Sequence, residues 1–191
     1  MSSTNAPFGM RPAFHPSGLD RASALADGIL STYNTDILKG QPVKMATGGV
    51  IQVAAAGDAF LGCFSGVEFT DTTGRRRVSN TWPANTAYQA GSCIAYFYND
   101  PNIVYEIQAA GSLAQTSIGD EADLSNTTAG STTTGLSACT LSTTLAGAGN
   151  SAQMRIINLA PYPDNAWGDS YTIVRATIAE YQFAGAAGTA I

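Results

Sequence analysis

Apolar and polar side chains alternate along most of this chain with the two-residue period of β-strands. The clearest segment runs from Phe60 to Thr70, where every second residue falls on the same face of an extended chain. Asp71 to Gly74 supplies turn residues, and Arg76 to Trp82 then runs back. This order of strand, turn and strand predicts a β-hairpin.

The same pattern recurs often enough to predict about nine short strands. Turn residues such as Asn99-Asp100-Pro101-Asn102 separate them, and short strands at this spacing favour an antiparallel β-barrel or sandwich. Strands and amphipathic helices do not alternate, which argues against a nucleotide-binding parallel sheet. Residues 109–135 are predicted to be mostly loop. The nine predicted strands are 41–45, 50–54, 60–70, 76–82, 90–98, 103–108, 136–141, 153–159 and 171–183.

The two ends of the chain depart from this pattern. Residues 1–35 contain prolines, and their apolar anchors Phe8, Phe14 and Leu19 follow neither a helical nor a strand period. We therefore predict an extended N-terminal arm over 1–35, in which 23–30 forms a short helix or continues the arm. A β domain is predicted over 36–183 and a flexible tail of small residues over 184–191.

Composition narrows the choice of partners. Of the 191 residues only 12% are charged, and the net charge is −5. A surface with so few charges does little to keep copies apart in solution. It suits a protein whose faces pack against other subunits. The acidic excess between residues 99 and 169 makes nucleic acid an improbable partner, because phosphate binding needs a basic face. No stretch approaches the roughly 20 apolar residues of a membrane span, and residues 1–10 do not form a signal peptide, so we expect synthesis in a host cytoplasm.

Few residues suggest catalysis or metal binding. His15 is the only histidine, and no motif supplies a nucleophile beside it, so we predict no catalytic residues and no cofactor. Asp120, Glu121 and Asp123 lie close together but lack the spacing of a calcium loop, which favours a solvated acidic loop over a metal site.

The three cysteines are far apart in sequence and lack metal-type spacing. Their apolar or small-residue neighbours predict buried free thiols. They are Cys63, Cys93 and Cys139.

Two further features allow a structural and a functional interpretation. Trp82 and Trp167 adjoin predicted loops, where tryptophan either closes the end of a β core, the favoured interpretation, or stacks on a ligand. Arg75, Arg76 and Arg77 adjoin the predicted hairpin turn, either as a solvated loop tip or as a contact for an acidic partner surface.

Several short segments, taken in order, resemble the head decoration (cement) proteins of tailed bacteriophages. They are Asn5-Ala6-Pro7-Phe8-Gly9, Arg11-Pro12, His15-Pro16-Ser17-Gly18, Phe60-Leu61-Gly62, Gly66-Val67-Glu68-Phe69-Thr70-Asp71, Trp82-Pro83, Asp100-Pro101, Tyr105-Glu106-Ile107-Gln108 and Asn165-Ala166-Trp167-Gly168-Asp169.

The resemblance implies a β-rich, non-enzymatic virion protein, commonly a homotrimer. Such a protein binds the outer capsid surface where major capsid subunits meet, and it stabilises the shell. A tail or head–tail connector subunit, or a glycan-binding β module, remains an alternative. The residues that we expect to contact the capsid or another partner are Phe8, Arg11, Phe14, His15, Arg75, Arg76 and Arg77.

Overall fold

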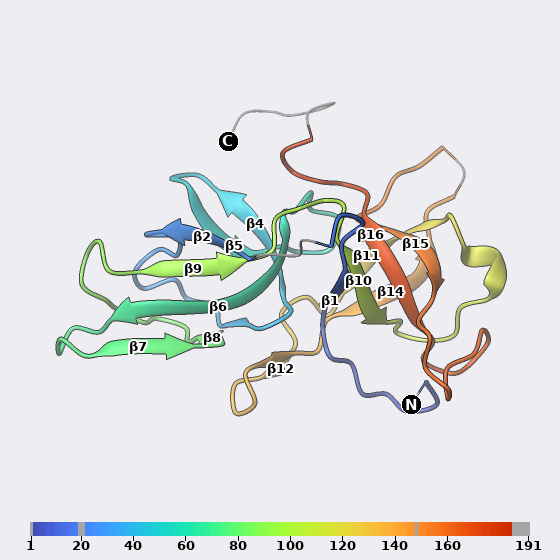
Figure 1. Ribbon diagram of the computed structural model, residues 1–191, viewed down its shortest axis with the longest axis horizontal. Helices are drawn as coiled ribbons and strands as arrows, with labels where there is room; N and C mark the ends of the chain where they lie inside the picture. The colour runs from blue at the N-terminus through green and yellow to red at the C-terminus, as the bar shows by residue number, and fades with distance from the viewer. Residues whose placement is uncertain (1, 19–21, 148, 185–191) are drawn as a thin grey trace.

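The computed structural model describes residues 2–18, 22–147 and 149–184, and its strands form two six-stranded antiparallel sheets that occupy the two ends of the molecule (Figure 1). Sheet 1 has the order β1-β10-β16-β15-β11-β14. Its strands are β1 (Arg11–Phe14), β10 (Val104–Gln108), β16 (Ile173–Ile178), β15 (Met154–Leu159), β11 (Glu121–Ser125) and β14 (Thr140–Leu145).

Sheet 2 has the order β2-β9-β6-β4-β5, and β7 also pairs with the long strand β6. Its strands are β2 (Ser23–Ala26), β9 (Ile94–Phe97), β6 (Gly62–Thr70), β4 (Pro42–Ala46), β5 (Val50–Val53) and β7 (Arg76–Ser79).

Two short ladders and one helical turn complete the described elements. The ladders join β3 (Ile37–Leu38) to β8 (Thr81–Trp82), and β12 (Gly130–Ser131) to β13 (Leu136–Ser137). The 3₁₀ turn η1 (Gln115–Ser117) is three residues long. None of the helical structure in the described residues has the length and apolar character that a membrane crossing requires.

These observations confirm the predicted fold class. The described chain is mainly β with antiparallel sheets, consistent with a sandwich, and its described strands do not close into a barrel. The described residues form sixteen strands, where the sequence predicted nine. One additional strand, β3, is only two residues long and lacks a period of its own, because its pairing with β8, more than 40 residues away, defines it.

Each sheet has its own apolar core. Tyr105 and Ile107 belong to the core of sheet 1, and Tyr181 packs against both cores. Trp82 is fully buried in the core of sheet 2, where its ring makes an edge contact with Phe69 at a centroid distance of 5.3 Å. The prediction that Trp82 closes a β core is therefore confirmed.

The described residues among the first 35 pair with or pack against the chain's own sheets. β1 pairs with β10 in sheet 1, and β2 pairs with β9 in sheet 2, so 23–26 is a strand rather than a helix. Met10 and Ile29 are buried in the two cores. Closer to the N-terminus, the Gln108 side chain bonds the backbone of Thr4 and Ala6. The predicted anchor Leu19, and the predicted tail from residue 185 onward, lie outside the described residues.

Candidate interaction surfaces

The structure brings three of the predicted contact residues, Phe8, Arg11 and Phe14, onto one face of sheet 1. The strand register places Arg11 beside Glu106 and Glu106 beside Arg175. The Arg11 guanidinium lies 4.7 Å from the centroid of the Phe8 ring, and that of Arg175 lies 5.4 Å from the centroid of the Phe14 ring. These distances are typical of cation–π contacts.

Glu106 is the centre of this cluster. Its buried carboxylate accepts hydrogen bonds from Arg11 Nη2 at 2.7 Å and from Arg175 Nε and Nη2 at 3.2 Å. Tyr162 also donates its hydroxyl to Glu106. A carboxylate with this many donors holds both arginines in place, and the three charged groups together carry a single positive charge. Glu106 therefore fixes where β1 lies on sheet 1.

His15 connects the β1–β2 link to the turn between β9 and β10. Its Nδ1 accepts hydrogen bonds from the Ser17 N–H at 3.0 Å and from the Ser17 hydroxyl at 2.6 Å, and its Nε2 lies 3.0 Å from Asp100 Oδ2. Because Nδ1 accepts the Ser17 N–H, Nε2 is the ring nitrogen nearest the carboxylate. The N–H of Asn102, together with its side chain and His15, lowers the pKa of Asp100, so Asp100 is an anion at neutral pH.

The order Ser17, His15, Asp100 resembles the residue order of a nucleophilic triad, but His15 Nε2 meets Asp100 without the geometry of a hydrogen bond. Acyl transfer also needs N–H donors facing the reacting oxygen. The nearest along the chain, the Gly18 N–H, instead donates to the His15 carbonyl at 2.8 Å. Neither His15 nor Ser17 lines the surface hollows of about 470, 390 and 270 Å³ in the described residues. We interpret the group as a clasp between the two segments that cross from one sheet to the other.

The remaining predicted contact residues lie on the β6–β7 hairpin, around Asp71. The Asp71 carboxylate accepts hydrogen bonds from the Thr73 hydroxyl at 2.6 Å, the Arg75 N–H at 3.0 Å and Arg77 Nε at 3.0 Å. The bond from the Thr73 side chain, followed by that from the Arg75 backbone, lowers the pKa of Asp71 well below its ordinary range. Asp71 therefore fixes the turn as an anion.

The structure neutralises two of the three hairpin arginines. Arg76 forms an ion pair with Glu68 at 2.7 Å, and Arg77 forms one with Asp71 at 3.0 Å. The side chain of Arg75 forms no ion pair within the described residues. The hairpin therefore presents about one net positive charge, far less than the run of three arginines in the sequence indicates.

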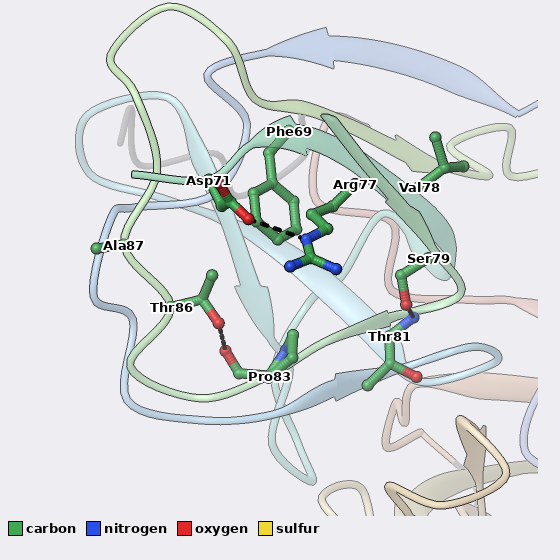
Figure 2. A pocket seen from close by; sticks show the side chains of 9 residues that line it. All are labelled: Phe69, Asp71, Arg77, Val78, Ser79, Thr81, Pro83, Thr86 and Ala87. Atoms are coloured by element: carbon green, nitrogen blue, oxygen red, sulfur yellow. Dashed lines mark hydrogen bonds and ion pairs between the residues drawn. The ribbon is translucent and has the colours of Figure 1, made fainter. Parts of the chain in front are cut away.

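A hollow of about 470 Å³ lies on one side of the hairpin. Figure 2 shows Phe69, Asp71 and Arg77 around its centre, with the Asp71–Arg77 ion pair across the opening, while the side chain of Val78 points away. Consecutive side chains of a strand point to opposite faces. Val78 therefore belongs mainly to the other face of sheet 2, where it is 76% exposed.

That other face, here called the outer face of sheet 2, carries few charges. The register aligns Val78, Glu68, Ile94 and Ala26 in one row across four strands. Their strand neighbours Phe69, Ala95 and Phe97 point into the core. Among the described residues the Glu68–Arg76 ion pair supplies the charge on this face, and a hollow of about 270 Å³ lies beside it. The residues of the outer face are Ala24, Ala26, Gly66, Glu68, Thr70, Arg76, Val78, Ile94 and Tyr96.

The acidic run contradicts one prediction. Glu121 and Asp123 lie on strand β11 and not in a solvated loop. Glu121 pairs with Arg155 on the adjacent strand at 2.5 Å, and Asp123 accepts a hydrogen bond from the Gln153 N–H at 3.2 Å. The partners come from a strand about 30 residues later, so the local sequence does not reveal them. Within the described ranges no group of three metal-ligating side chains comes together.

The prediction for the cysteines is confirmed, because Cys63, Cys93 and Cys139 are free and buried. Burial raises the pKa of Cys93 to about 11 and that of Cys139 to about 12, and it raises the pKa of Cys63 further. The three thiols are therefore protonated at neutral pH, which makes them poor nucleophiles.

Comparisons with protein-family models, with curated proteins and with solved structures gave no match to this chain. The candidate surfaces therefore rest on their own geometry.

Several residues of the outer face were not predicted as contact residues. Ile94 and Tyr96 alternate with the core residues Ala95 and Phe97, and this alternation was readable in the sequence. Their alignment with Val78 was not readable, since it depends on the register among β9, β6 and β7.

Proposed function

We propose that this chain is a capsid decoration protein of a tailed bacteriophage. In this role it binds the outer capsid surface where major capsid subunits meet, stabilises the shell and catalyses no reaction. The resemblance of its ordered sequence segments to such proteins supports the proposal. So do its mainly β fold and its low share of charged residues.

The observation that carries the proposal is the outer face of sheet 2. Val78 on β7 is 76% exposed. In the described chain β7 pairs only with β6, so its other edge is free. The small side chains of Ala24 and Ala26 let a partner approach this part of the sheet closely. Few charges lose water when such a face is covered, since Glu68 and Arg76 already neutralise each other.

This geometry suits a contact that is weak singly and strong collectively. A standard stable interface buries about 800 Å² on each partner. The outer face places the neutral Glu68–Arg76 pair between Val78 and Ile94, so a partner meets apolar side chains on both sides of it. A shell offers many identical sites, so linked copies gain effective concentration without further contacts. We propose the homotrimer as the form that links them.

The test is co-sedimentation of the purified chain with shells assembled from the major capsid protein alone. We expect Val78→Asp to reduce binding at least tenfold, because it adds a net charge to a face whose only described ion pair is already neutral. Leu30→Asp is the matched control, since Leu30 is also exposed but lies outside the outer face. We expect Leu30→Asp to bind like the wild type.

Circular dichroism of both variants establishes that they are folded. If folded Val78→Asp binds shells as tightly as the wild type, the outer face is not the docking surface. If the wild type itself does not bind shells, the proposed function is wrong. The glycan-binding alternative loses one of its two tryptophans, because Trp82 is fully buried.

A further inference from the structure

A third hollow lies where the N-terminal segment meets both sheets. Its volume is about 390 Å³, within the range of small-molecule sites. Phe8 and Met10 line it from the N-terminal segment, Phe64 from β6 and Leu136 from β13. Leu136 is 45% exposed although it is a large apolar residue. We call this site the junction hollow.

Two cations line the junction hollow, in a chain whose net charge is −5. Arg11 is already held by Glu106, and the cluster of Arg11, Glu106 and Arg175 retains one positive charge. Lys39 is exposed and forms no ion pair within the described residues. The hollow therefore combines apolar walls with an ammonium group that has no anionic partner.

The wall near Lys39 is neutral. Cys63 also lines the hollow, and burial raises its pKa so far that the thiol is protonated at neutral pH, even though the charge of Lys39 acts in the opposite direction. No anion of the lining residues therefore neutralises Lys39. A ligand carboxylate would supply that missing charge at the exposed edge of the hollow.

We propose that the junction hollow binds a small monocarboxylate with an aromatic or aliphatic body. The body lies among Phe8, Met10 and Leu136, and the carboxylate pairs with Lys39. The choice of an acid follows from charge complementarity, and the choice of an apolar body follows from the walls. This proposal does not rest on shell binding.

The test is a titration of the full ¹⁵N-labelled chain with 4-phenylbutyrate, followed by NMR chemical shifts. The matched probe 4-phenylbutan-1-ol has the same body without the charge. We expect the acid to shift amides around Lys39, Gly40 and Leu136, and to bind at least tenfold more tightly than the alcohol.

Two variants assign the charge contact. We expect Lys39→Met to weaken binding of the acid at least tenfold and to leave binding of the alcohol within twofold. Arg75→Gln removes one positive charge elsewhere on the surface, and we expect it to leave both affinities unchanged. Leu136→Glu places a carboxylate in the hollow, and we expect it to abolish binding of the acid should Lys39→Met fail to fold.

The proposal is overturned if acid and alcohol bind equally, if the shifts map to another part of the chain, or if folded Lys39→Met binds the acid like the wild type. Shell binding is measured separately with Val78→Asp. Failure of one experiment therefore leaves the other interpretable.

Discussion

At the scale of single residues, hydrogen bonds decide what the charged side chains do. Three consecutive arginines suggest a strongly basic tip, yet Glu68 and Asp71 pair with two of them. Asp71 also accepts bonds from Thr73 and from the backbone of the turn, which lowers its pKa. The Asp71 carboxylate therefore fixes the conformation of the hairpin turn. The arginines around it serve mainly as its partners.

This arrangement predicts how stability depends on pH. A carboxylate whose pKa is lower in the folded state stabilises the fold above its unfolded pKa of about 3.9, and this contribution is lost as the pH falls toward the folded pKa. We expect Asp71→Asn to be less stable than the wild type by a constant amount from pH 5 to 8. Below about pH 4 the difference shrinks. Urea denaturation at a series of pH values measures it.

The exposed neighbour Thr72 offers a control, since its side chain makes no hydrogen bond within the described residues. Thr72→Ala should follow the pH profile of the wild type. A stability difference between the wild type and Asp71→Asn that stays constant down to pH 2 would contradict the prediction.

At the scale of elements, the N-terminal segment belongs to the fold. β1 extends sheet 1, β2 extends sheet 2, and Glu106 holds β1 through Arg11. The sequence interpretation treated these residues as an arm because prolines interrupt them and no strand period is visible. Strand partners about 70 to 95 residues away make these residues into strands, although their local sequence shows no strand period.

The prediction at this scale concerns Met10, which is 1% exposed. We expect Met10→Ala to lower the free energy of unfolding by about 2–4 kcal/mol, because it leaves a cavity in the core of sheet 1. Leu30→Ala, at a residue that is 59% exposed, should change it by less than about 1 kcal/mol. Chemical denaturation measures both. Equal, small effects would mean that the segment does not contribute to the fold.

At the scale of the whole molecule, the structure places apolar and weakly charged surface outside two separate cores. A surface of this kind favours association. The outer face of sheet 2 is the area that we assign to the shell, which leaves other exposed apolar residues, such as Ile157 on β15, for contacts between copies.

The resemblance to head decoration proteins implies a trimer, so we expect the purified chain to have three times the 19.7 kDa chain mass. Light scattering coupled to size-exclusion chromatography measures the mass directly. The mass should stay constant over a tenfold dilution. A mass equal to one chain at all concentrations would contradict the prediction, and a ring of five, six or twelve copies would favour a tail or connector subunit.

The amino-acid sequence alone determined the fold class, most of the central strands and the burial of Trp82 and the cysteines. These features depend on local hydrophobic periodicity and on turn residues, which are written along the chain. The hairpin from Phe60 to Trp82 is the best example, since β6, β7 and β8 lie within it.

Only the tertiary structure decided which side chains face one another. The ion pairs of Glu106, Glu121 and Arg76, the clasp at His15 and the row from Ala26 to Val78 all depend on strand register and on sheet order. A shift of register by one residue turns every side chain of a strand to the opposite face. Register is set by packing of the whole core, and for this reason the surfaces of this protein could not be located from its sequence.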